Sequence, residues 1–75
     1  MAGVKKLVQK MKNRPNGIRF NELEKVLNHY GYILVRSKGS HHHFRNDEGD
    51  VLPVPKEHPI KAVYIKEALK RIGEA

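Results

Sequence analysis

The chain has 75 residues, enough for one small domain but not for a second core. It contains no cysteine, which excludes disulfides, thiolate metal sites and cysteine nucleophiles. Fifteen Lys and Arg against eight Asp and Glu give a formal net charge of +7, which is typical of a domain that meets a polyanion or an acidic protein. No apolar run approaches the roughly 18 residues of a membrane span, and the start lacks the apolar block of a signal peptide. We therefore expect a cytoplasmic protein.

The positive charge is concentrated in two parts of the chain. Residues 1–19 carry six basic residues and no acidic one, and residues 32–46 contain Arg36, Lys38 and Arg45, again without an acid. Residues 47–59 reverse the sign. Two acid-free basic segments favour contact with a polyanion. The same side chains could also serve solubility alone, because charge by itself specifies no ligand.

Residues 1–13 predict an amphipathic helix. Its apolar residues have the i, i+3, i+4, i+7 spacing of a single helix face, and they are Val4, Leu7, Val8 and Met11. Pro15 and the Asn16-Gly17 pair then end the helix. A basic helix of this kind can pack onto the sheet, lie on an anionic membrane, or fill the groove of a partner protein.

Two further helices are predicted. One begins at Asn21 as N-cap, with Glu24 completing a capping box, and ends at Gly31. The last helix begins at Pro59 and ends at Gly73. Each has one apolar stripe, made of Leu23, Val26, Leu27 and Tyr30 in the first and of Ala62, Ile65, Ala68, Leu69 and Ile72 in the second.

Three short segments between these helices have strand character. Residues 32–36 and 41–45 are separated by a tight turn, and a second turn precedes a third strand at 51–55. Pro53 and Pro55 cannot donate to ladders on both sides, which places the third strand at a sheet edge. The order α-α-β-β-β-α predicts an α+β domain, with helices on one face of a three-stranded antiparallel sheet and the other face open.

The unusual stretch is Gly39-Ser40-His41-His42-His43-Phe44. If Phe44 faces the core, strand alternation places His42 on the same face and sends His41, His43 and Arg45 to the open face. The two imidazoles then lie beside a glycine turn and close to Lys38 and Arg36.

Three interpretations of these histidines compete. They can be ordinary polar strand residues, with His42 tucked under the helices. They can form a metal site, in which His41, His43 and His58 are ligands, although no zinc-binding spacing is present and the surroundings are cationic. Alternatively, one histidine can do acid–base work on a bound phosphodiester, while neighbouring cations hold the phosphate.

The third interpretation favours RNA as the substrate. A magnesium nuclease needs a cluster of carboxylates, and this basic region offers none. Cleavage without a metal is easiest on RNA, since the 2′-hydroxyl is a built-in nucleophile and the enzyme has only to move protons and stabilise charge. An endoribonuclease therefore needs no more than this segment supplies.

The chain also resembles a known family. A helix ending at Gly31, the strand Tyr32-Ile33-Leu34-Val35-Arg36, the GSHHHF segment, a short Val-Pro strand and a helix over residues 60–72 are together similar to HicA, the YcfA-like toxin of bacterial HicAB systems. The likeness covers roughly residues 20–72, so we expect one HicA-like domain over residues 1–75 with an extra basic helix and linker at 1–17.

The resemblance implies a double-stranded-RNA-binding-domain-like (dsRBD-like) fold, ribosome-independent cleavage of mRNA, and neutralisation by a HicB-type antitoxin protein. We expect no cofactor. The family's catalytic histidine follows Gly-Ser and corresponds to His41, and its glycine corresponds to Gly39. We expect the RNA-binding residues to be Arg36, Lys38, Gly39, Ser40, His43 and Arg45. A non-catalytic RNA-binding or DNA-binding module is the main alternative, and a regulatory protein-interaction domain is the third.

Overall fold

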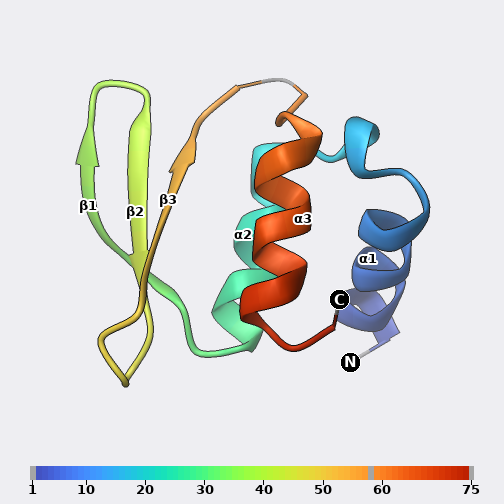
Figure 1. Ribbon diagram of the computed structural model, residues 1–75, viewed down its shortest axis with the longest axis horizontal. Helices are drawn as coiled ribbons and strands as arrows, with labels where there is room; N and C mark the ends of the chain where they lie inside the picture. Colours follow the sequence, from blue (N-terminus) through green and yellow to red (C-terminus); the bar gives the residue numbers. More distant parts are fainter. Residues whose placement is uncertain (1, 58, 75) are drawn as a thin grey trace.

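The computed structural model describes residues 2–57 and 59–74. Its elements are α1 (Ala2–Asn13), the 3₁₀ turn η1 (Pro15–Gly17), α2 (Phe20–His29), β1 (Ile33–Lys38), β2 (His41–Arg45), β3 (Val51–Pro55) and α3 (Ala62–Arg71). Figure 1 shows the sheet at one end of the molecule and the three helices beside it. The predicted α+β class and the order α-α-β-β-β-α are confirmed.

Helix α1 follows its predicted pattern. Val4, Val8 and Met11 are buried, and the lysines of the helix are exposed. The helix ends where Arg14 donates its backbone N–H to the carbonyl of Lys10, at 2.7 Å, before Pro15 opens η1. A proline here lacks the N–H that a continuing helix would need.

Both other helices begin at residues different from those predicted. Helix α2 begins at Phe20 and not at Asn21, because the Glu22 carboxylate accepts a hydrogen bond from the backbone N–H of Arg19, at 2.9 Å. Glu22 therefore forms the capping-box hydrogen bond that we predicted for Glu24. Helix α3 begins at Ala62 and not at Pro59.

The late start of α3 has a packing reason. Ile60 is fully buried, and its backbone N–H donates to the carbonyl of Ile18 at 3.0 Å. This bond ties the residue to the segment between η1 and α2 and takes the place of a first helical turn. The predicted helix ends are confirmed, since Gly31 and Gly73 have positive φ angles of 90° and 80°, which favour glycine.

The three strands form one antiparallel sheet with the order β1-β2-β3. The predicted edge position of β3 is confirmed. Between β1 and β2 the register shifts at Val35, so that Leu34 lies opposite Phe44 whereas Arg36 lies opposite His43. This β-bulge puts Leu34 on the inner face and Arg36 on the outer face, although the two residues are only two apart.

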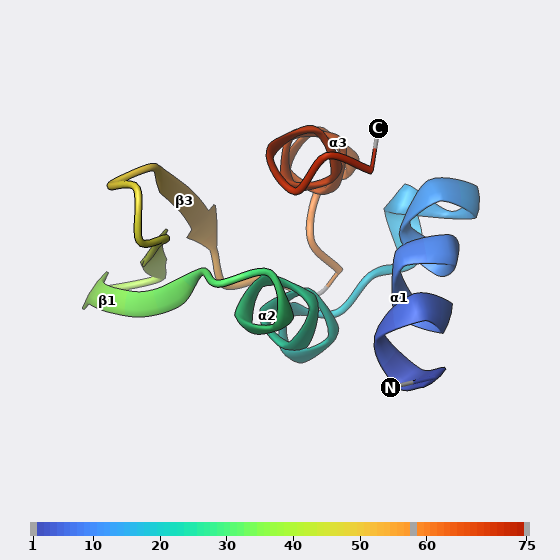
Figure 2. The ribbon, with the colours of Figure 1, turned by 90° about the horizontal axis from the view of Figure 1, so that it is seen from below.

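Figure 2 shows how the layers are stacked. Helices α2 and α3 lie next to the sheet, and α1 lies on their far side, where it contacts α2, α3 and η1. All helices are thus on one side of the sheet as predicted, but α1 packs on the other helices and not on the sheet itself. The physical reason is that a three-stranded sheet is already covered by two helices. No helix in the described ranges is long and apolar enough to cross a membrane.

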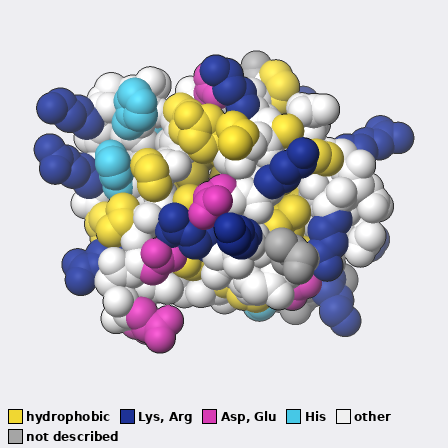
Figure 3. Space-filling model, viewed as in Figure 1, with side chains coloured by type: hydrophobic (Ala, Val, Ile, Leu, Met, Phe, Trp, Pro, Cys, Tyr) yellow, Lys and Arg dark blue, Asp and Glu magenta, His cyan; other side chains and the backbone are white. Residues whose placement is uncertain are grey.

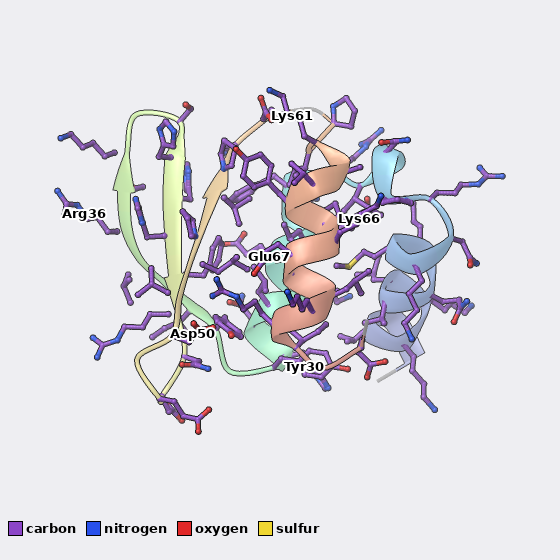
Figure 4. The ribbon with its side chains drawn as sticks, in the orientation of Figure 1. Tyr30, Arg36, Asp50, Lys61, Lys66 and Glu67 are labelled. Atoms are coloured by element: carbon purple, nitrogen blue, oxygen red, sulfur yellow. The ribbon has the colours of Figure 1, made fainter. Side chains whose placement is uncertain are left out.

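One polar network fixes the sheet relative to α3. The hydroxyl of buried Tyr32 donates to the Asp50 carboxylate at 2.5 Å, and Arg71 Nη1 donates to both oxygens of the same carboxylate at 2.8 and 3.0 Å. Arg71 Nε also binds Glu67, at 2.7 Å. Figure 4 shows Asp50 at the end of the sheet that faces the C-terminal part of α3. Because Asp50 directly precedes β3 and Arg71 belongs to α3, the network fixes the orientation of the sheet relative to that helix.

Candidate functional site

The face of the sheet turned away from the helices, here called the outer face, carries three cross-strand rows. From β1 through β2 to β3 the rows are Lys38–His41–Pro55, Arg36–His43–Pro53 and Ile33–Arg45–Val51. Directly opposite residues in antiparallel strands have Cβ atoms about 4.5–5.5 Å apart. Each outer histidine therefore has a cation on one side and a proline on the other, and none of the three strands contains an acidic residue.

His41 is the most accessible histidine of the outer face. It is exposed, begins β2, and follows the Gly39-Ser40 turn directly. Gly39 has a φ of +62°, and the space into which a side chain would project is empty to 4 Å. The backbone of the turn is thus open to a ligand beside the His41 imidazole.

His42 faces the opposite way, as predicted. Its ring packs edge-on against Phe20, with ring centroids 4.9 Å apart, and its Nδ1 lies 3.2 Å from the carbonyl oxygen of Ser40. Phe44, two residues later on the same face, is fully buried. These contacts give His42 a packing role.

His43 is half-buried between Arg36 and Pro53. Figure 4 shows the Arg36 side chain extending from β1 away from the helices. In the space-filling view, histidines and cationic side chains lie together over the sheet end of the molecule (Figure 3). The predicted residues of the outer face are therefore close to one another in the fold.

The cations of the outer face have no acidic partner within the described ranges. All ion pairs found there lie elsewhere, and they are Lys10–Glu22, Lys12–Glu74, Arg71–Asp50 and Arg71–Glu67. Arg36, Lys38 and Arg45 are exposed. Exposed cations without ion-pair partners, on strands that contain no carboxylate, suit the binding of phosphate groups.

The metal-site interpretation finds no support in the part of the chain that the structure describes. No group of three or more His, Cys, Asp or Glu side chains comes together there to hold an ion. The third ligand of that interpretation, His58, lies outside the described residues.

A comparison with known protein families shows to which family the chain belongs. The family model described as the HicA toxin of bacterial toxin–antitoxin systems matches residues 20–74, which include every residue of the outer face. The chain belongs to the HicA toxin family. It is therefore the toxin of a bacterial toxin–antitoxin system, and an antitoxin is its partner. No curated protein and no solved structure matches the chain.

Helix α1 and η1 precede the region that matches the HicA model. Since α1 lies behind α2 and α3, it does not cover the outer face (Figure 2). This position excludes shielding of the outer-face histidines by α1.

Sequence inspection missed two features beside the histidines. Lys56 donates its backbone N–H to the carbonyl of Ser40 at 2.6 Å, and its ammonium lies 5.7 Å from the centre of the Phe20 ring. No local signal marks it, because residue 40 lies beside residue 56 only through the pairing of residue 41 with residue 55. The second feature is a group of exposed apolar side chains near the histidines of the outer face. It is formed by Ile33, Val35 and Val51.

Proposed function

We propose that this HicA-family toxin is an endoribonuclease that cleaves mRNA without a metal and uses His41 as its catalytic residue. The observation that carries the proposal is the position of His41, exposed beside an open glycine turn and between Lys38 and Pro55. An imidazole can accept and donate protons near neutral pH, because its unperturbed pKa is about 6.5.

The chemistry needs only groups found on the outer face. The His41 imidazole removes the proton from a ribose 2′-hydroxyl, and the 2′ oxygen attacks the adjacent phosphorus. The bond to the 5′ oxygen breaks, and this oxygen takes up a proton from water, while the His41 imidazolium returns its proton to the solvent. The products are a 2′,3′-cyclic phosphate and a 5′-hydroxyl, so atoms and charge balance without an oxidant or a metal. Lys38, one strand away, stabilises the negative charge that develops on the phosphoryl oxygens.

The remaining residues of the outer face hold the RNA. Arg36 and Arg45 contact neighbouring phosphates, and His43 lies in the row next to His41. The Gly39-Ser40 turn allows the backbone of the RNA to come close to the protein backbone. Phosphate contacts position the RNA but carry no base preference.

For the partner we propose a HicB-type antitoxin that covers the outer face. Ile33, Val35 and Val51 are 59%, 50% and 43% exposed there, beside the unpaired cations. Apolar anchors beside a basic surface suit an acidic protein that buries both. Such a partner blocks the RNA by occupying its site.

The test is cleavage of a labelled transcript by the purified toxin with a metal chelator present. We expect cleavage to persist and to leave cyclic phosphate ends, and we expect a transcript with 2′-deoxy residues to resist. Binding without cleavage would instead support the alternative of a passive RNA-binding module. Activity that depended on added metal, or that cut the deoxy-substituted strand equally, would contradict the mechanism.

A further inference from the structure

The exposed side of α1 carries a stripe of hydrogen-bond donors, here called the donor stripe. It consists of Lys6, Gln9, Lys10 and Asn13, which have the i, i+3, i+4, i+7 spacing of one helix face, and of Arg14, which directly follows the last residue of α1. All five are exposed, and together they line a shallow hollow. The stripe contains no acidic and no apolar residue.

Two cations of the donor stripe are free to bind a ligand. Lys10 is 2.9 Å from the Glu22 carboxylate, and Gln9 donates to the Asn13 side chain at 3.3 Å. Lys6 and Arg14, in contrast, form no ion pair within the described ranges. Lys6 lies on the helix and Arg14 directly after its end, and the two cations flank the two amides.

The surroundings of the donor stripe select the kind of ligand. A membrane-bound helix needs a free apolar face, but Val4, Val8 and Met11 are buried against α2 and α3. A protein interface usually has buried apolar anchors, and no large apolar side chain on the described part of α1 is exposed. Cations and amides without apolar anchors are typical of contacts to a phosphate–sugar backbone.

The donor stripe and the outer face lie at opposite ends of the molecule. The sheet and α1 occupy the two ends of the longest axis, which measures 29 Å, and cationic side chains gather at both ends (Figures 1 and 3). An RNA bound at His41 can therefore reach α1 only if it is long enough to pass around the body of the domain.

We propose that the donor stripe of α1 is a second RNA-contact surface, which binds the backbone of a long RNA held at the outer face. This proposal rests on RNA being the ligand of the outer face, as proposed above. The second surface would bias the toxin toward long, unstructured messages over short fragments, because only a long strand gains both sets of contacts.

The experiment compares two lengths of 2′-O-methyl RNA, which the proposed mechanism cannot cleave, on the full chain. The probes have about six and about thirty nucleotides, a range that spans typical single-strand site sizes. The stripe variant is Lys6→Gln/Arg14→Gln. The matched control is Lys66→Gln/Lys70→Gln, which removes the same charge from exposed positions of α3.

For the long RNA, we expect the stripe variant to weaken binding several-fold and to lower the salt slope by about 1.4, since each single-strand phosphate contact contributes about 0.7. The short RNA should bind the stripe variant and the wild-type chain equally, and the control should match the wild type in its response to RNA length. Thermal melting checks that both variants are folded.

Three results would overturn the proposal. The first is an unchanged affinity of the stripe variant for long RNA while Arg36→Gln weakens binding, which would leave the proposed function intact. The second is an equal loss for both RNA lengths or an equal loss in the control, which would indicate a general effect of charge. The third is a stripe variant that binds both RNA lengths as tightly as the wild type does and loses affinity only for duplex DNA or for the antitoxin. If no RNA binds the wild-type chain, the proposed function fails as well.

Discussion

The imidazole of His42 packs edge-on against the ring of Phe20, with the ring centroids 4.9 Å apart and the planes at 62°. Phe20 is the first residue of α2, so this contact fastens the middle strand of the sheet to the helical layer. Because side chains alternate along a strand, His41 and His43 must then point outward. The three adjacent histidines therefore have two different roles, fixed by one aromatic contact.

The first prediction concerns His42. We expect His42→Ala to destabilise the fold by about 1 kcal/mol, because an aromatic pair of this geometry is worth about 0.5–1.5 kcal/mol. The intrinsic rate of RNA cleavage should change little at a temperature where the variant is folded. Thermal melting together with a cleavage assay checks this, and an unchanged melting temperature would show that the contact with Phe20 contributes nothing.

A second prediction concerns the outer face and salt. We expect the affinity for a short single-stranded RNA to fall with salt at a log–log slope of about −2 to −3, since three or four phosphate contacts contribute about −0.7 each. Arg36→Gln should make this slope shallower by about 0.7. Filter binding with uncleavable RNA across a salt series measures both values. A slope near zero would exclude phosphate binding by Arg36, Lys38 and Arg45.

A third prediction concerns the antitoxin, which we expect to bind the outer face. In the complex, we expect slower amide hydrogen exchange in β1 and in the Gly39-Ser40 turn, and unchanged exchange in α1. Val35→Glu should weaken antitoxin binding at least tenfold, equivalent to about 1.4 kcal/mol. Val63→Glu is the control, because Val63 is a 64% exposed apolar residue on α3. Protection confined to α1 would mean that the antitoxin does not block the RNA by occupancy.

The Tyr32–Asp50–Arg71 network predicts a dependence of stability on pH. The Tyr32 hydroxyl, and after it Arg71, lower the pKa of the Asp50 carboxyl. Burial and the hydrogen bond to Asp50 raise the pKa of Tyr32 to about 12. The Asp50 contribution is thus present above its unfolded pKa of about 3.9 and is lost as the pH falls below it. The Tyr32 contribution is complete below about pH 10 and is lost as the pH rises toward about 12.

Urea unfolding of the wild type and of Tyr32→Phe across this pH range measures the loss of stability at acid pH (the acid limb) and at alkaline pH (the alkaline limb). In the variant, we expect a smaller loss of stability above pH 10, because the buried phenol is gone. The acid limb should also shift, since Asp50 has lost a hydrogen-bond donor. Superimposable alkaline limbs in the two proteins would contradict the role of Tyr32.

Much of the fold follows from local patterns in the sequence. The apolar stripes predict the three helices, the turn glycines predict where helices and strands end, and the prolines predict an edge strand. The alternation from Phe44 back to His41 was enough to separate the inward histidine from the outward ones. These features depend on residues within a few positions of one another, and sequence periodicity reports such relationships well.

Other features depend on contacts between distant residues and could not be predicted. The bulge at Val35 reverses the alternation of β1, and nothing within the strand itself marks it. Helix α3 begins late because Ile60 is tied to Ile18, some forty residues away. The position of α1 behind α2 and α3 is set by how much of the sheet those helices already cover. The neighbourhood of His41 was therefore predictable in its β2 part, whereas the position of Lys56 beside the turn depends on the register between strands.

The most direct test of the central claim compares His41→Ala with His43→Ala in cleavage of a labelled transcript. His41 is exposed and contributes little to the core, so we expect its loss to change stability by less than about 0.5 kcal/mol. Cleavage by His41→Ala should fall by about 10²–10⁴-fold with RNA affinity nearly intact, as for the loss of an acid–base group, and His43→Ala should retain more activity. Full activity in His41→Ala with loss in His43→Ala would move the catalyst two residues along the same face. Full activity in both variants would contradict catalysis by an outer-face histidine altogether.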